Sequence, residues 1–243
     1  QAIVAKAGFE ANIIENHDQP RGASLFIPEE DYGFYSLSAL ATIIFCERGL
    51  PFLYQGQEIG MSNRQWKYDE FNDLETINQY QIALKAGMSK EQALEIARHH
   101  SRDNARTPMQ WSSEENAGFS KAKPWMPVNE NYKVVNVAEE EKEYGSILNF
   151  YKRLIAFYKS EEYNEILTYG DFRPIYEKED HIFAYSRSYG CQKLVLICNF
   201  SSKEKDIELS EDYENVIFVN YEQTTVIGNT LKMKPYECVI YEM

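Results

Sequence analysis

Residues 13–22, IIENHDQPRG, change from an apolar run to a polar loop within a few positions. Ile13 and Ile14 are typical of a buried strand, whereas Pro20 stops a regular continuation because it has no backbone N–H to donate. Between them a histidine, His17, stands next to a carboxylate, Asp18. Taken alone, this pattern is more often a turn than a site, since Asn and Asp favour turns. The neighbouring elements have to decide between the two interpretations.

The elements around this stretch predict parallel β/α units. Residues 9–15 are expected to form a short buried strand. Residues 36–49 carry apolar side chains at helical spacing and end at Gly49, a common helix terminator. The apolar part of LPFLYQGQE, which begins at Leu50, is expected to form a second short buried strand. A strand–helix–strand order is typical of a parallel sheet, and in β/α barrels the loops after the strands carry the active site.

Three polar segments are therefore candidates for a functional site. Each also has an ordinary structural explanation: Glu58 suits a helix start, and Arg102 with Asp103 suits an internal ion pair. The candidates are the loop after the first strand (Asn16, His17, Asp18, Arg21), the loop after the second (Gln55, Gln57, Glu58) and residues 100–111, HSRDNARTPMQW.

The rest of the chain changes character twice. Residues 75–87 and 89–100 are expected to form helices, the second with a capping box between Ser89 and Gln92. The Pro- and Gly-containing stretch that follows, up to residue 138, is expected to be irregular, and residues 145–162 to form an amphipathic helix. From about residue 163, short β-rich runs separated by polar turns predict an antiparallel sandwich. A domain boundary is expected near residue 162.

The composition excludes some classes of function. The 243 residues carry a formal net charge of −13, which disfavours nucleic acid because its phosphates are bound by Lys and Arg. No apolar run is long enough for a bilayer, so no membrane association is predicted. The four cysteines form no C-x-x-C pair, which favours reduced thiols and a cytoplasmic protein. The first residues, QAIVAKAGFE, resemble the interior of a longer protein.

Four stretches, in one order along the chain, resemble the oligo-1,6-glucosidase and dextran glucosidase branch of the α-amylase superfamily. The resemblance covers nearly the whole chain, closely up to the last helix and loosely in the β-rich part. The four are ENHDQPR (15–21), FLYQGQEIGM (52–61), SRDNARTPMQW (101–111), and AGFS followed by KPWMPVN (117–129).

The resemblance implies a (β/α)₈ barrel followed by an all-β domain, so the fold class is α/β plus all-β. On that pattern residues 1–162 hold strands seven and eight of a TIM barrel, a long insert after strand eight (about 56–138) and the last helix. Residues 163–243 form the antiparallel β-sandwich. The first six strands lie outside this chain, together with the nucleophilic Asp and the acid/base Glu of the family. The missing N-terminal half of the barrel is therefore an expected partner.

The resemblance also implies roles for individual residues. Asp18 is expected to be a catalytic residue that stabilises the transition state, by accepting hydrogen bonds from O2 and O3 of the glucose in subsite −1. Charge-assisted bonds of this kind are strong, and they tighten as the ring approaches an oxocarbenium ion. His17 is expected to donate to the same sugar. Arg102 is expected to hold O4 of the terminal glucose, with its usual acidic partner in the missing half, and Glu75 to face subsite +1.

Other residues of these motifs are expected to have supporting roles. Arg106 is expected to brace its loop, and Gln57 and Glu58 to shape the turn after strand eight. Trp111 and Trp125 either line the cleft or pack the subdomain, with packing favoured. The sequence contains no run like R-L-D-R, which counts against the sugar isomerases of the same superfamily.

The function that the resemblance implies is part of a retaining, exo-acting α-glucosidase that hydrolyses α-1,6-linked isomalto-oligosaccharides. Trehalose-6-phosphate hydrolysis and α-1,4-glucosidase activity stay open, because the residues that choose between them lie mainly in the missing half. A non-catalytic carbohydrate-binding or structural piece is the alternative from another class. These residues alone are expected to be inactive, because they lack the nucleophile. No cofactor or metal is expected in this chain, and any Ca²⁺ would belong to the missing N-terminal part.

Overall fold

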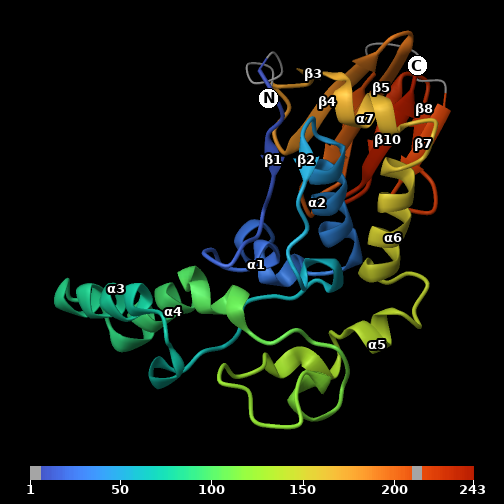
Figure 1. The fold of residues 1–243 in the computed structure, drawn as a ribbon. Helices are drawn as coiled ribbons and strands as arrows, with labels where there is room; N and C mark the ends of the chain where they lie inside the picture. The colour runs from blue at the N-terminus through green and yellow to red at the C-terminus, as the bar shows by residue number, and fades with distance from the viewer. Residues whose placement is uncertain (1–6, 210–214) are drawn as a thin grey trace. The chain divides into compact units, whose positions relative to one another are not determined.

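The computed structural model describes residues 7–209 and 215–243, and it separates into two compact units. The first unit comprises the segments up to residue 13, 33–52 and 150–243, and the second comprises 14–32 and 53–149. Figure 1 shows the helices and strands of both. Because each unit is assembled from separate segments of the chain, this division does not test the boundary near residue 162, which stays a prediction.

The first unit contains the strand–helix–strand motif that the sequence predicts (Figure 1). Strand β1 (Ala11–Asn12) pairs in parallel with β2 (Leu50–Pro51), and helix α2 (Phe34–Cys46) connects them. The Asn12 side chain donates hydrogen bonds to the carbonyls of Ile44 and Glu47, at 3.4 and 3.2 Å. This amide therefore fixes the strand to the end of the helix.

Gly49 has a different role from the predicted one. Helix α2 ends at Cys46, so Gly49 does not terminate it. Gly49 has a φ of +143°, and a Cβ there would lie 2.4 Å from Asn12 Oδ1 and 2.7 Å from the carbonyl oxygen of Glu10. Glycine is required because the chain passes too close to β1 for any side chain.

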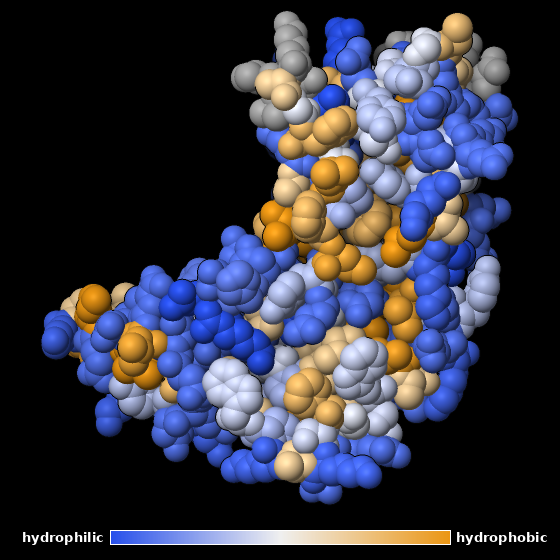
Figure 2. Space-filling model, viewed as in Figure 1, coloured by the Kyte–Doolittle hydropathy of each residue, from blue (hydrophilic) through white to orange (hydrophobic). Residues whose placement is uncertain are grey.

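The two strands are shorter and less buried than predicted. Ile13 is 45% exposed, Leu50 is 49% exposed and Phe52 is 52% exposed. Figure 2 shows apolar residues gathered on the face over β1 and β2. A sheet of two strands has too few neighbours to bury both of its faces, so the prediction of buried strands was wrong for these side chains.

The β-rich end of the chain forms the predicted antiparallel sandwich. Its first sheet has the strand order β3-β4-β5-β10-β7, and its second has the order β6-β9-β8. Buried residues of both sheets, among them Ile197, Leu231 and Val239, share one core. The strands are β3 (Asp171–Pro174), β4 (Ile182–Tyr189), β5 (Gln192–Asn199), β6 (Lys205–Glu208), β7 (Asn215–Val219), β8 (Thr225–Ile227), β9 (Thr230–Met233) and β10 (Cys238–Glu242).

Two helices and a buried arginine complete the first unit. Helix α6 (Ile147–Tyr158) confirms the predicted amphipathic helix, and α7 (Asn164–Tyr169) follows it. Arg187 in β4 is 1% exposed and donates to the carbonyls of Cys46, at 2.7 Å, and Gly170, at 3.0 and 3.3 Å. These carbonyls lie at the C-terminal ends of α2 and α7, where a positive charge is favoured by the helix dipoles. Arg187 thereby links both helices to the sandwich.

The second unit is built from short helices around one long helical pair. Helices α3 (Leu74–Lys85) and α4 (Lys90–His100) confirm the two predicted helices, and Ser89 and Gln92 form the predicted capping box. Their packing partners include the fully buried Trp66. The remaining segments are α1 (Gly22–Phe26), η2 (Glu29–Asp31), η3 (Gln57–Ile59), η4 (Tyr68–Glu70), η5 (Arg102–Arg106), η6 (Glu115–Gly118), η7 (Glu130–Lys133) and α5 (Val137–Glu140).

None of the helices in the described part of the chain has both the length and the apolarity needed to cross a membrane.

Candidate active site

The loop after β1 and the turn η5 meet at the carboxylate of Asp18. Arg106 Nη2 lies 3.0 Å from Asp18 Oδ1, and Arg102 Nη1 lies 3.6 Å from the same oxygen. Arg106 also donates through Nε to the carbonyl of His17, at 2.9 Å, so it braces the loop that carries Asp18. The Asp18 side chain nevertheless stays 53% exposed. Two guanidinium groups therefore orient a carboxylate that is still open to a ligand.

His17 and Asp18 present a nitrogen and two oxygens on one exposed surface. His17 Nε2 lies 3.2 Å from Asp18 Oδ2, and the His17 side chain is 74% exposed. A ring nitrogen that can donate and a carboxylate that can accept are then available side by side. This arrangement suits a ligand with hydroxyl groups on adjacent carbons.

Arg102 is held by an acidic residue that the sequence analysis missed. Asp73 accepts hydrogen bonds from Arg102 Nε, at 3.2 Å, and from Arg102 Nη2. Asp73 caps the N-terminus of α3, is 4% exposed and accepts a further bond from Thr76 Oγ1 at 2.8 Å. Arg102 thus has an acidic partner within this chain. The motif NDLETIN contains an N-cap signal at Asp73, but nothing in it indicates the distant arginine.

Asp103 joins the same network from its other side. Its Oδ2 accepts the backbone N–H groups of Asn72 and Asp73, at 2.7 and 2.9 Å, and its Oδ1 lies 3.9 Å from Arg106 Nη1. The suggested ion pair between Arg102 and Asp103 is therefore replaced by two others, Arg102 with Asp73 and Arg106 with Asp103. The alternating charges connect η5, the start of α3 and the Asp18 loop.

Asp18 and Arg102 line a pocket of about 260 Å³. The carboxylates that line the pocket outnumber its one guanidinium group. Burial, with a smaller effect of His99, lowers the pKa of His100, so this histidine adds little positive charge near pH 7. A neutral polyhydroxylated ligand suits this wall better than an anion. The lining residues are Asp18, Asp73, Glu75, Thr76, Gln79, His100 and Arg102.

The other predicted residues fall into two groups. Glu75 lies with its Oε2 3.8 Å from Arg102 Nη2, is 62% exposed and lines the pocket. Glu58 Oε2 accepts the Gly56 N–H at 2.7 Å, and Gln57 Oε1 accepts the Tyr54 N–H at 3.4 Å, which confirms that both shape the turn.

The two tryptophans of the motifs do not pack in a core. Trp111 is 51% exposed and Trp125 is 78% exposed, so the favoured packing interpretation was wrong. Neither residue lines the pocket at Asp18. The sequence alone does not distinguish these two tryptophans from Trp66, which is the one that is fully buried in a core of this unit.

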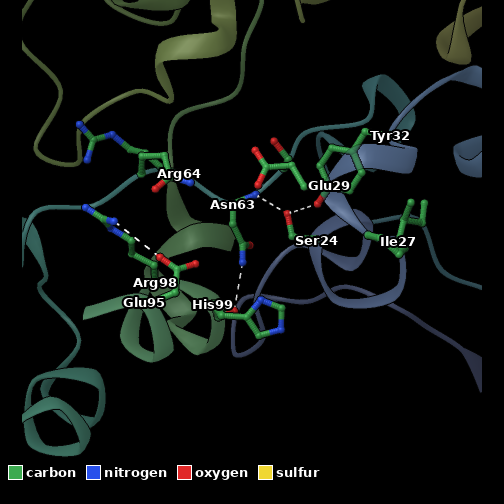
Figure 3. Close-up of a pocket in the computed structure, with 12 residues that line it drawn as sticks. Ser24, Ile27, Glu29, Tyr32, Asn63, Arg64, Glu95, Arg98 and His99 are labelled. Atoms are coloured by element: carbon green, nitrogen blue, oxygen red, sulfur yellow. Dashed lines mark hydrogen bonds and ion pairs between the residues drawn. The ribbon is translucent and has the colours of Figure 1, made fainter. Parts of the chain in front are cut away.

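A second cavity, of about 210 Å³, lies in the same unit between α1, η2, the segment after Met61 and α4 (Figure 3). Many of its polar groups bond to one another: Ser24 Oγ accepts from Tyr32 and from the Asn63 N–H, and the Asn63 amide donates to the His99 carbonyl. None of the predicted site residues lines it.

The Asp73–Arg102 pair predicts a specific acid sensitivity. Burial raises the pKa of the Asp73 carboxyl, but the hydrogen bonds from Arg102 and Thr76 outweigh it and hold this pKa at about 2. A depressed pKa contributes stability above the unfolded value, about 3.8, and that contribution is lost as pH falls through about 2. We expect Asp73→Asn to lower the melting temperature at pH 6, and the gap from the wild type to narrow by pH 2.5.

Melting curves of the wild type, Asp73→Asn and a control, Asp69→Asn, recorded between pH 6 and 2.5, would measure this gap. Asp69 lies in η4 and is exposed, so its substitution is expected to leave the melting temperature within about 1 °C of the wild type. A gap for Asp73→Asn that is as wide at pH 2.5 as at pH 6 would contradict the assigned role of the charge.

Two sequence models of known domains match the chain. The alpha-amylase catalytic domain matches residues 1–170, and the C-terminal domain of the alpha-amylase SusG matches residues 182–240. The second match falls on the antiparallel sheets of the sandwich.

Known proteins resemble the chain over its whole length. An oligo-1,6-glucosidase of Bacillus cereus is 38% identical in sequence. The match covers 100% of this chain and 44% of the glucosidase. The solved structure of a trehalose-6-phosphate hydrolase of Bacillus licheniformis is 36% identical in sequence, with a TM-score of 0.92. The match covers 100% of this chain and 44% of that one. The isomaltulose synthase SmuA of Protaminobacter rubrum is 33% identical with a TM-score of 0.86, covering 97% and 43%. The chain therefore spans less than half the length of these relatives.

Proposed function

The chain belongs to the alpha-amylase family, and from this premise we propose that it is part of a retaining, exo-acting α-glucosidase that hydrolyses α-1,6-linked isomalto-oligosaccharides. The observation that carries this proposal is the exposed Asp18 carboxylate, which two arginines orient at the edge of a pocket of about 260 Å³. The relatives named oligo-1,6-glucosidase favour the α-1,6 linkage.

In this proposal Asp18 acts on the sugar ring rather than on the scissile bond. Its oxygens would accept hydrogen bonds from O2 and O3 of the glucose in subsite −1, with His17 donating to the same sugar. These bonds strengthen as positive charge develops on the ring, so they lower the barrier rather than only binding the substrate. Arg102, fixed by Asp73, would hold O4 of the terminal glucose, and Glu75 would face subsite +1.

Bond cleavage itself needs groups that we do not assign to this chain. A retaining glycosidase uses two carboxyl groups about 5 Å apart, one as nucleophile and one as acid and then base. We propose that both come from the rest of a (β/α)₈ barrel, in which β1 and β2 are strands seven and eight. The apolar face over β1 and β2, with Ile13, Leu50 and Phe52 exposed, would then be covered by that partner half.

The charge of the pocket favours a neutral substrate over trehalose 6-phosphate. A dianionic phosphate would meet the carboxylates of Asp18, Asp73 and Glu75 in the pocket wall, and they outnumber the arginines beside them, Arg102 in the wall and Arg106 at Asp18. This argument ranks trehalose-6-phosphate hydrolysis second, although a solved hydrolase of that name is among the similar structures. Sugar isomerisation ranks lower still, because the chain has no R-L-D-R run.

A reducing compartment, such as the cytoplasm, is part of the proposal. Cys198 in β5 and Cys238 in β10 stand directly opposite each other and are fully buried, yet both are free thiols. In an oxidising compartment two neighbouring thiols of this kind tend to be oxidised.

The proposal is tested by assaying the full-length protein that contains this chain. We expect hydrolysis of isomaltose with a kcat/KM at least about 10-fold above that for maltose or trehalose 6-phosphate, and no turnover of an aryl α-glucoside by residues 1–243 alone. Cleavage of trehalose 6-phosphate with isomaltose untouched would replace the first function by the second. Turnover by residues 1–243 alone would contradict the assignment of the nucleophile to another part of the protein.

A further inference from the structure

A buried ion pair closes the base of the loop that carries His17 and Asp18. Glu15 is 2% exposed and Arg21 is fully buried, and Arg21 Nη1 lies 3.2 Å from Glu15 Oε2. The other oxygen of Glu15 accepts the Gly22 N–H at 2.9 Å. One carboxylate therefore binds both the side chain and the backbone at the far end of the loop, and the residues between are held as a closed turn.

The same arginine reaches two other segments of the unit. Arg21 Nη1 donates to the carbonyl of Gln55 at 2.7 Å, in the turn after β2. Arg21 Nε donates to the carbonyl of Asn104 at 3.3 Å, and Asn104 lies in η5 between Arg102 and Arg106. The guanidinium group thus connects the Asp18 loop directly to the turn whose two arginines face Asp18.

We propose that Glu15 and Arg21 are positioning residues, which set the Asp18 carboxylate in register with Arg102 and Arg106. This inference rests on the proposed function, because it assigns the pair a role in orienting Asp18 on a sugar. Neither side chain touches the substrate, since both are buried.

The Glu15–Arg21 ion pair is explained better by the geometry that it imposes on the loop than by a contribution to stability. Burying two charges costs free energy that their attraction often only balances. Burial raises the pKa of Glu15, against the opposing effect of Arg21, so this carboxylate is not in a favourable environment for its charge. What the pair provides is a planar fork that binds a carboxylate and two carbonyls in fixed directions, which a lysine ammonium cannot do.

The backbone at Gly22 packs tightly against the pair. A Cβ at Gly22 would lie 3.1 Å from Glu15 Cγ and 3.2 Å from Glu15 Oε1. The loop therefore returns against the carboxylate itself, and small changes in the pair are transmitted to the residues between. A displacement of about 1 Å at a reacting group can cost 10²-fold in rate.

Arg64 provides a matched control in the same unit. Its side chain is 7% exposed, and it binds Glu70 at 2.7 Å, Glu130 at 2.5 Å and the carbonyl of Val128 at 3.1 Å. It lines the second cavity (Figure 3) and not the pocket at Asp18. Arg64→Lys therefore removes another guanidinium fork of this unit, one whose carboxylate partners are more exposed than Glu15, without acting on the Asp18 loop.

The test compares Arg21→Lys with Arg64→Lys in the full-length protein. The substrate is whichever of isomaltose, maltose and trehalose 6-phosphate the wild type hydrolyses with the highest kcat/KM. We expect Arg21→Lys to lower kcat by about 10- to 100-fold with KM within about 3-fold of the wild type, because misplaced Asp18 loses its effect in the transition state. Arg64→Lys is expected to lower the melting temperature while kcat and KM stay within about 2-fold.

The outcomes separate this inference from the function on which it rests. If Asp18→Asn abolishes turnover but Arg21→Lys behaves like Arg64→Lys, the positioning role is wrong and the proposed function stands. If Asp18→Asn is fully active, the proposed function fails first. Should Arg21→Lys not fold, Glu15→Gln supplies the measurement: its amide oxygen can still accept the Gly22 N–H, and an unchanged kcat would overturn the inference.

Discussion

Replacing Asp18 by Asn in the full-length protein is expected to lower kcat by about 10³-fold, with a much smaller change in KM. The substitution keeps the size of the side chain but removes the charge that two arginines orient, at 3.0 and 3.6 Å. A neutral amide accepts weaker hydrogen bonds from the sugar hydroxyls, and the difference grows as the ring becomes cationic. Initial rates over a range of substrate concentrations would give kcat and KM separately.

A matched control for this prediction is Asp180→Asn. Asp180 is an exposed aspartate just before β4, and its substitution is expected to change kcat by less than about 2-fold. Circular dichroism and melting curves would show that both variants are folded. If Asp18→Asn kept the wild-type kcat, the role of Asp18 in the transition state would be wrong, and the pocket would have to be explained as a binding site without catalysis.

The elements that local sequence rules could predict are those whose stability is itself local. The periodicity of α3 and α4 and the Ser89–Gln92 capping box depend on residues within a few positions, and all appear in the structure. The antiparallel sandwich was predictable for a similar reason, because short β-rich runs between polar turns fix strand order within hairpins such as β4–β5.

Burial was harder to predict, because it depends on neighbours that a local pattern does not contain. Leu50 and Phe52 read as buried strand residues, yet both are exposed beside a sheet of only two strands. Trp125 and Trp66 have the same chemistry and lie in the same region, but one is 78% exposed and the other is fully buried. Helix α7 also escaped prediction, since its six residues are too few to show a period.

The candidate site shows the same contrast between what the sequence indicates and what depends on distant neighbours. The resemblance pointed to Asp18 and Arg102, which line one pocket, whereas the contacts that orient them join residues far apart in sequence. Asp73 is 29 residues from Arg102, and Arg106 is 88 residues from Asp18. No helical or strand period relates such positions, so only the folded chain shows that Asp73 is a partner of Arg102.

Replacing Arg102 by Lys is expected to lower kcat/KM by about 10²-fold, mainly by raising KM. Arg102 bonds Asp73 through Nε and Nη2, and its Nη1 points to the carboxylate of Asp18. A lysine has one donor group and cannot bind Asp73 bidentately while also reaching O4 of the glucose. The contact to O4 is expected in the bound substrate as well as in the transition state, which is why its loss should affect KM more than kcat.

A modified substrate can show whether Arg102 acts on O4 or only braces the pocket. The wild type is expected to lose about 10²-fold in kcat/KM on an isomaltose whose terminal glucose lacks the 4-hydroxyl, whereas Arg102→Lys should lose little more on the same compound, because the two changes remove one interaction. Arg98→Lys is the control: Arg98 lies in α4, before the break at Ser101, and donates to the carbonyl of Trp66 at 2.7 Å, so it should keep the wild-type response to both substrates. If the effects of Arg102→Lys and the deoxy substrate were fully additive, Arg102 would not contact O4, and the pocket would need another group to recognise the end of the chain.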